Sequence, residues 1–191
     1  MKLIFATHNQ HKLEEIQQLI TTSVELSSLN DLNFSKEIEE TGKNLKENAL
    51  IKAQTIYQTF KTNTFADDTG LEIDFLNGEP GVLSARYAGS DKNSEANIQK
   101  VLNLMQGETN RKARFRTVIA LIYNQQEFLF EGIVEGQILE TPRGNKGFGY
   151  DPIFQPQGYN LSFAEMSASI KNSISHRAKA IEKLIQFIDQ Q

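Results

Sequence analysis

Short apolar runs and regularly spaced apolar stripes alternate along the whole of this 191-residue chain. The run from Leu3 to Ala6 is typical of a strand, and the stripe of Leu13, Ile16, Leu19 and Ile20 that follows has helical spacing. The alternation continues, and it predicts further helices at about 43–60, 98–105 and from 173, and further strands at 24–29, 64–66, 71–76, 115–123 and 127–139. This order of elements predicts a mixed α/β fold.

The last two predicted strands are separated only by Asn124-Gln125-Gln126, which indicates a long antiparallel hairpin. No repeat, linker or low-complexity tract interrupts the chain. A chain of this length buries about 70% of its surface on folding, which suits one ordinary core. We therefore expect a single domain over residues 1–191, with two lobes and a central cleft.

Composition excludes several classes of function. The chain has no Cys, which excludes thiol catalysis, cysteine-ligated zinc and iron–sulfur clusters. The longest apolar run, Val118 to Tyr123, is far shorter than the roughly 20 residues of a membrane span. The apolar run near the N-terminus is shorter than the core of a signal peptide, so we expect a cytoplasmic protein. With a net charge of -4, the chain lacks the overall positive charge of nucleic-acid-binding proteins. An anionic ligand therefore needs a local patch of positive charge.

The first polar cluster follows the first predicted strand and comprises Thr7, His8, Asn9, Gln10, His11 and Lys12. Backbone N–H groups at a helix N-terminus attract an anion, and Lys12 adds a positive charge. The glycines and the Gly-Lys-Ser/Thr ending of a Walker loop are absent. The alternative is that Thr7 or Asn9 only caps the helix.

The second cluster is acidic. Glu39 and Glu40 precede a predicted helix that carries Glu47 in its first turns, so a loop carboxylate could converge with Glu47. Carboxylate oxygens of this kind suit Mg²⁺, which substrate phosphates and water then complete. The alternative is a solvated run of charges.

The third cluster, Asp67-Asp68-Thr69-Gly70, lies between two apolar runs. Two adjacent carboxylates are costly to bury unless they bind a metal or hydrogen-bond donors. Their contiguity argues against a haloacid-dehalogenase-type phosphatase, in which one residue separates two Asp residues. The alternative is an acidic turn exposed to solvent, for which Gly70 supplies the conformational freedom.

The fourth cluster is split between the glycine-rich segment 144–152 and residues 171–177. The glycines let the backbone approach a ligand closely, and Phe148 offers a face on which a base could stack. Lys171, His176 and Arg177 supply donors near the start of the last predicted helix. The alternatives are an ordinary turn, a core position for Phe148 and a surface position for His176.

Together these clusters provide carboxylates for a metal, cations for phosphates and an aromatic ring for a base, which predicts a nucleotide site. Six motifs occur in an order seen in one family: Ala6-Thr7-x-Asn9-x-x-Lys12-x-x-Glu15; Glu40-Thr41-Gly42 with Glu47-Asn48-Ala49 and Lys52-Ala53; Ala66 to Leu71; Pro80-Gly81 with Ser84 to Tyr87; Gly147 to Phe154; and Ser175-His176-Arg177. Through these motifs nearly the whole chain resembles the non-canonical purine nucleoside triphosphate pyrophosphatases, the inosine triphosphatase or Ham1-like family.

The resemblance implies a homodimer with an elongated, curved mixed sheet flanked by helices. It implies hydrolysis of inosine, deoxyinosine and xanthosine triphosphates to the monophosphate and pyrophosphate, with Mg²⁺. It implies that Asp68 is the general base and that Asp68, with Glu39 or Glu40, holds the metal. The implied substrate contacts are Thr7, His8, Asn9, Gln10, His11, Lys12, Thr69, Phe148, Gly149, Tyr150, Asp151, Lys171, His176 and Arg177, of which the last two would read the 6-oxo edge of the base.

Two other classes of protein are compatible with the same clusters. A nucleotide-binding regulatory module would use the cations and Phe148 without needing the carboxylates. A Maf-like pyrophosphatase would share the fold but prefer modified pyrimidine nucleotides. Pyrophosphate release from a panel of purine and pyrimidine triphosphates separates the three.

Overall fold

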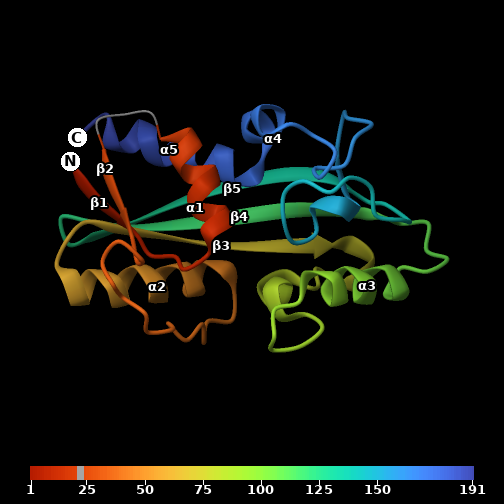
Figure 1. The fold of residues 1–191 in the computed structure, drawn as a ribbon, viewed down its shortest axis with the longest axis horizontal. Helices are drawn as coiled ribbons and strands as arrows, with labels where there is room; N and C mark the ends of the chain where they lie inside the picture. The colour runs from red at the N-terminus through yellow and green to blue at the C-terminus, as the bar shows by residue number, and fades with distance from the viewer. Residues whose placement is uncertain (21–23) are drawn as a thin grey trace. The chain divides into compact units, whose positions relative to one another are not determined.

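The structure, a computed structural model, describes residues 1–20 and 24–191. Six strands form one mixed sheet in the order β2-β1-β3-β4-β5-β6 (Figure 1). Strand β1 runs parallel to both β2 and β3, whereas β6 is antiparallel to β5. The strands are β1 (Lys2–Phe5), β2 (Glu25–Ser28), β3 (Thr64–Ile73), β4 (Lys112–Tyr123), β5 (Gln126–Ile138) and β6 (Phe154–Pro156). The helices are α1 (Gln10–Leu19), α2 (Leu45–Phe60), α3 (Ser94–Leu104), α4 (Ala168–Ile174) and α5 (His176–Ile188), with short 3-10 helices η1 (Asp74–Leu76), η2 (Gly81–Arg86) and η3 (Asp151–Ile153).

The mixed α/β fold predicted from the sequence is confirmed, and β4 and β5 form the expected neighbouring strands. One prediction is wrong: the segment from Thr64 to Ile73 is a single strand, not two short strands on either side of a loop at Asp67–Gly70. The strand continues because partners from other elements satisfy both aspartates. The sequence pattern also missed β6 and α4, which are only three and seven residues long.

The chain divides into two compact units. Unit 1 comprises Met1–Asp68, Thr117–Gly132 and Arg177–Gln191, and unit 2 comprises Thr69–Arg116 and Ile133–His176. Strands β3, β4 and β5 contribute residues to both units, so neither unit is one continuous segment. Two units agree with the two lobes expected from the sequence, and the cleft between the lobes stays a prediction.

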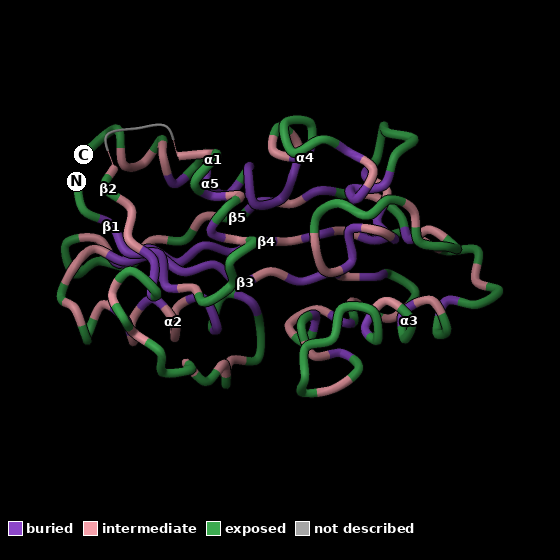
Figure 2. The backbone as a smooth tube through the Cα atoms, in the orientation of Figure 1, coloured by how far each residue is buried: buried purple, intermediate pink, exposed green. Residues whose placement is uncertain are grey.

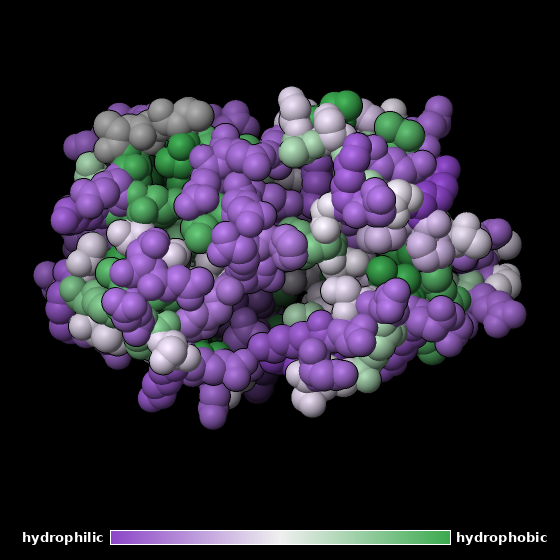
Figure 3. Space-filling view, in the orientation of Figure 1, coloured by the Kyte–Doolittle hydropathy of each residue, from purple (hydrophilic) through white to green (hydrophobic). Residues whose placement is uncertain are grey.

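In unit 1, α1 and α5 cover one face of the sheet and α2 covers the other (Figure 1). Leu13 and Ile16 of α1 and Ile181 and Leu184 of α5 are buried in one cluster with residues of β1, β3 and β4. Figure 2 shows the buried backbone concentrated in the strands, and Figure 3 shows hydrophilic residues over α1. Helix α1 is therefore amphipathic, with its apolar stripe on the sheet.

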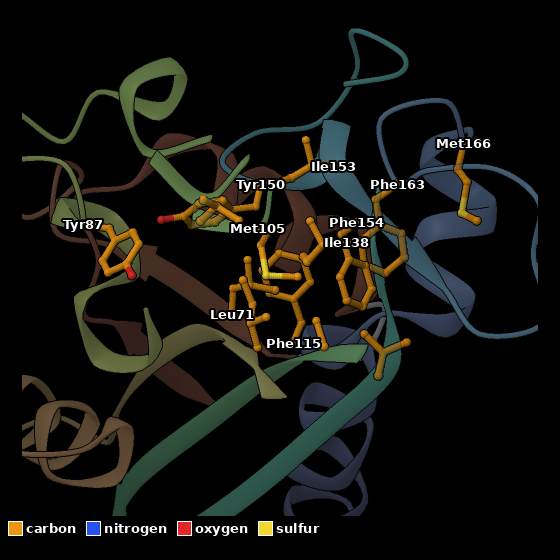
Figure 4. Packing of buried hydrophobic residues seen from close by; sticks show 14 residues of the cluster. Leu71, Tyr87, Met105, Phe115, Ile138, Tyr150, Ile153, Phe154, Phe163 and Met166 are labelled. Atoms are coloured by element: carbon orange, nitrogen blue, oxygen red, sulfur yellow. The ribbon is translucent and has the colours of Figure 1, made fainter. Parts of the chain in front are cut away.

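In unit 2, aromatic side chains form the centre of the core (Figure 4). The ring of Phe115 on β4 lies 4.7 Å from that of Phe154, and Phe154 lies 5.2 Å from Phe163. Val101 and Met105, from α3 and the residue that caps it, belong to the same cluster. Among the residues that the structure describes, no helix is long and apolar enough to cross a membrane.

Candidate active site

Asp67 and Asp68 are adjacent on β3, and their side chains point to opposite faces of the strand. This follows from the strand geometry, in which successive side chains alternate between faces. Asp67 contacts side chains from α1 and α5, whereas Asp68 contacts side chains from α2. Both are buried, with 2% and 7% of their surface exposed, so the alternative of an acidic turn in solvent is wrong. The two carboxylates therefore have different surroundings.

Asp67 lies between two cations. Its Oδ1 accepts a hydrogen bond of 2.9 Å from Lys12 Nζ, and its Oδ2 accepts one of 3.3 Å from Arg177 Nε. The Arg177 guanidinium, 1% exposed, also donates from Nη1 to Glu15 of α1. These four side chains form a largely buried chain of alternating charges that joins α1, β3 and the start of α5.

The charges of these neighbouring side chains shift the pKa values of Asp67 and Lys12. Burial alone would raise the pKa of Asp67, but Lys12 and Arg177 outweigh it and hold that pKa well below its usual range. Burial lowers the pKa of Lys12, and Asp67 opposes this shift. The contacts of 2.9 Å and 3.3 Å show that Asp67 serves as the counter-ion of both cations.

Asp68 faces α2 and the loop before it. Asn48 Nδ2 donates to Asp68 Oδ2 at 3.3 Å, and Lys52 Nζ donates to Asp68 Oδ1 at 3.2 Å. The same Lys52 ammonium donates to Glu40 Oε1 at 2.7 Å. Burial raises the pKa of Asp68, although the charges of Lys52 and Lys12 oppose the shift. A carboxylate with a raised pKa is better suited to accept a proton than an ordinary surface aspartate.

The loop that carries Glu40 is tied to the start of α2. Asn48 is fully buried, and its Oδ1 accepts the Gly42 N–H at 2.8 Å while its Nδ2 reaches Asp68. Asn44 is the N-cap of α2 and accepts from the Glu47 N–H. Asn48 thus connects the loop backbone to the carboxylate of Asp68.

The structure separates the acidic residues that the sequence grouped together. Glu40 accepts a hydrogen bond from Lys52, which also donates to Asp68, whereas Glu39 is exposed to solvent. Glu47 does not converge with a loop carboxylate, because its exposed side chain accepts the Lys43 N–H at 2.7 Å and completes the helix cap. Glu40 is therefore the residue of this cluster that the fold brings to Asp68.

The start of α1 carries the first predicted cluster. Asn9 caps the helix by accepting the Lys12 N–H at 3.2 Å, and Thr7 Oγ1 accepts the Asn9 N–H at 3.1 Å. The substrate contacts expected of Thr7 and Asn9 stay predictions. The side chains of Gln10 and His11 are exposed and lie near Glu14. His8 Nε2 lies 3.2 Å from the Lys36 carbonyl oxygen. Of this cluster, Lys12 is the residue whose side chain contacts a buried aspartate, Asp67.

The position between Glu40 and Asp68 has the chemistry of a magnesium site. Both carboxylates approach one point, which the ammonium of Lys52 marks. Within the described part of the chain, no group of three His, Asp or Glu side chains is arranged to hold a metal. Mg²⁺ commonly takes only one or two protein carboxylates and completes its shell with water and substrate phosphates, so the two present fit it.

Unit 2 gathers most of the fourth predicted cluster around Asp151. Its carboxylate accepts the Phe148 N–H at 2.9 Å and a hydrogen bond of 2.6 Å from Lys171 Nζ. The Lys171 ammonium also lies 5.0 Å from the centre of the Phe148 ring. Phe148 is half-buried, whereas Lys171 and Asp151 are buried. Loop 147–151 is thus held in a defined conformation around a charged pair.

The remaining predicted residues have mixed positions. Tyr150 is a core residue whose hydroxyl donates to the Ser84 carbonyl oxygen at 2.8 Å, and Gly149 beside it has a φ of 60°. His176 is buried, and its ring stacks on Phe115 with centroids 4.7 Å apart, so the surface alternative for His176 is wrong. Thr69 is half-buried.

Sequence reasoning assigned no role to three residues of the network: Glu15, Asn48 and Lys52. A signal was present, because Asn48 and Lys52 are four residues apart and face the same side of α2. Lys12 and Glu15 have the corresponding spacing of three on α1. The partners on β3 and α5 are remote in sequence, so the pattern alone could not connect them.

Buried carboxylates beside lysine ammonium groups on a mixed α/β sheet can hold a divalent ion and stabilise negative charge on phosphate oxygens. The Ham1 family model matches residues 3–187, and the chain belongs to this family. It is 52% identical to a dITP/XTP pyrophosphatase of Christiangramia forsetii over 190 residues, which cover 100% of both chains. It is 46% identical to a dITP/XTP pyrophosphatase of Flavobacterium johnsoniae, with 98% of each chain covered.

Solved structures agree with this membership. The Ham1 protein of Staphylococcus aureus superposes with a TM-score of 0.90 at 37% identity, covering 100% of this chain and 99% of that one. A HAM1 protein of Coxiella burnetii superposes with a TM-score of 0.92 at 37% identity, covering 100% of both chains. The resemblance inferred from the six motifs is thereby confirmed.

Proposed function

We propose that this protein hydrolyses non-canonical purine nucleoside triphosphates, namely inosine, deoxyinosine and xanthosine triphosphates, to the monophosphate and pyrophosphate. The observation that carries the proposal is the convergence of Asp68, Glu40 and Lys52 on one point of unit 1, with Lys12 on the neighbouring aspartate. The names of the full-length relatives support the substrate class.

Asp68 is the general base of this proposal. Its buried carboxylate orients a water molecule toward the α-phosphorus and accepts a proton from it, while pyrophosphate leaves. Lys12, at the start of α1, and Lys52, on α2, stabilise charge on the phosphate oxygens. Mg²⁺ held by Glu40 and Asp68 would polarise the phosphate and neutralise part of its charge. Asn48 keeps Asp68 in place.

Base selection belongs to His176, Arg177 and Phe148 in this proposal. Hypoxanthine and xanthine present an acceptor at position 6, where adenine presents an amino donor. Donors from His176 and Arg177 match the acceptor, and an unmatched polar group in a buried site is rejected strongly. In the structure the Arg177 guanidinium contacts Glu15 and Asp67, and the ring of His176 stacks on Phe115. Phe148 would stack on the base.

The enzyme's cellular location, oligomeric state and metal requirement are also part of this proposal. We propose that it acts in the cytoplasm as a homodimer, without nucleic-acid or membrane partners, and requires Mg²⁺. A net charge of -4 and the local placement of the cations at the carboxylates agree with a small anionic substrate.

The substrate class is tested by pyrophosphate release from a panel of triphosphates. We expect kcat/KM for inosine and xanthosine triphosphates to exceed that for adenosine triphosphate by about 100-fold or more, because adenine lacks the 6-oxo acceptor. Preference for a modified uridine triphosphate would instead support the Maf-like alternative. Binding without pyrophosphate release would support a regulatory module.

Gly147 offers a test of the base-binding loop. A Cβ at this position would overlap the Asp151 carboxylate, which holds Phe148 and Lys171, and the φ of Gly147 is 72°. We therefore expect Gly147→Ala to raise KM for inosine triphosphate about 10-fold with a smaller change in kcat, because the reacting groups lie elsewhere. The matched control is Gly158→Ala, whose φ is also positive at 85° but whose Cβ would meet open space. Equal KM values for the two variants would contradict the role given to the loop.

A further inference from the structure

Lys52 occupies the point on which Glu40 and Asp68 converge. Its ammonium is 2.7 Å from Glu40 Oε1 and 3.2 Å from Asp68 Oδ1, and its side chain is largely buried. The two carboxylates come from different parts of unit 1, the loop before α2 and strand β3. One positive group of the chain itself thus stands where two hard oxygen donors meet.

We infer that Lys52 is a resident cation that occupies the metal position of the free protein and leaves it when a divalent ion binds between Glu40 and Asp68. The inference rests on the proposed function, because it assumes that these carboxylates hold the ion. An ammonium and a divalent ion cannot both fill one position, since like charges at contact distance repel strongly.

The release of Lys52 has a consequence for the substrate. A lysine ammonium is a point charge on a flexible four-carbon stem with three donors, so it can turn from carboxylate to phosphate oxygens without moving α2. Lys52 would then pass from Glu40 and Asp68 to the triphosphate that arrives with the ion. The free protein should therefore bind a divalent ion weakly, and the ion and the nucleotide should bind together.

The experiment measures Mn²⁺ binding without nucleotide. Free Mn²⁺ is followed by electron paramagnetic resonance during titration of the wild type and of Lys52→Met. We expect Lys52→Met to bind Mn²⁺ at least about tenfold more tightly, because the competing ammonium is gone. Lys46→Met is the matched control on an exposed position of the same helix, and it should bind Mn²⁺ as the wild type does.

Lys12→Met distinguishes displacement from a general effect of charge. Lys12 contributes a positive charge that acts on Asp68 but contacts Asp67. Displacement predicts a clearly smaller gain in Mn²⁺ affinity for Lys12→Met than for Lys52→Met. Equal gains in the two variants, or unchanged or weaker Mn²⁺ binding by Lys52→Met, would overturn the inference.

A second variant covers the case in which Lys52→Met does not fold. Lys52→Gln removes the charge but keeps a hydrogen-bond donor, and Mn²⁺ should raise its melting temperature more than that of the wild type, because ligand binding to the folded state stabilises it. An equal or smaller rise would count against displacement. Pyrophosphate release by the wild type tests the proposed function separately, so the two failures are distinguishable.

Discussion

Asp68→Asn is expected to lower kcat for pyrophosphate release by about 10²–10⁴-fold, the range for loss of a general base. Asparagine has nearly the same shape, and its amide oxygen can still accept from Asn48 or Lys52. It can neither accept the proton of the attacking water nor bind a divalent ion as strongly. The measurement is kcat under saturating inosine triphosphate and Mg²⁺, with thermal unfolding of the same preparation.

The neighbouring residue supplies the matched comparison. Asp67→Asn makes the same chemical change one position earlier, on the face of β3 that contacts Lys12 and Arg177. We expect Asp67→Asn to lower the free energy of unfolding more than Asp68→Asn does, because it leaves a fully buried guanidinium with less negative charge around it. Full activity in Asp68→Asn would remove Asp68 from the mechanism.

Arg177→Met is expected to destabilise the protein by about 3–5 kcal/mol, the cost of removing one partner from a buried ion pair. Asp67 and Glu15 would lose the guanidinium that contacts both. The methionine is also shorter than the arginine it replaces and leaves the site less well packed. Denaturant unfolding monitored by circular dichroism gives the difference in free energy.

An exposed ion pair provides the control for this prediction. Lys2 lies 3.6 Å from Glu25, and both side chains are largely exposed, so Lys2→Met should change the free energy of unfolding by less than about 1 kcal/mol. A loss in Arg177→Met no larger than the loss in Lys2→Met would show that the charge chain contributes little to stability.

Lowering the pH should reduce the difference in free energy of unfolding between Arg177→Met and the wild type. Asp67 has a pKa below its usual range, so its contribution to stability is present above the unfolded pKa of about 3.9 and is lost as the pH falls toward the folded pKa. Without Arg177 the pKa of Asp67 is less depressed, and the variant has less of this stability to lose. The gap in free energy of unfolding should therefore narrow below about pH 4.

Most of the regular structure could be predicted from local patterns. Helical spacing of Leu13 and Ile16 indicated α1, and the period of two in residues 115–123 indicated β4, because each pattern depends on neighbours in the chain. The prediction failed at Asp67, where adjacent carboxylates indicated a break in β3. Their partners come from α1, α2 and α5, up to 110 residues away, and no local pattern reports such pairing.

The amino-acid sequence by itself determined which chemical groups are present and in which order: carboxylates, lysines, a glycine-rich loop and an aromatic ring, in motifs specific enough to indicate the family. Only the tertiary structure decided which of these groups contact one another. Glu40, and not Glu39, shares the Lys52 ammonium with Asp68. Asp67 pairs with Lys12 and Arg177. Asn48 also contacts Asp68, and neither it nor Lys52 was assigned a role from the sequence. The alternation of side chains on a strand is local, but the helices that cover its two faces are set by long-range packing.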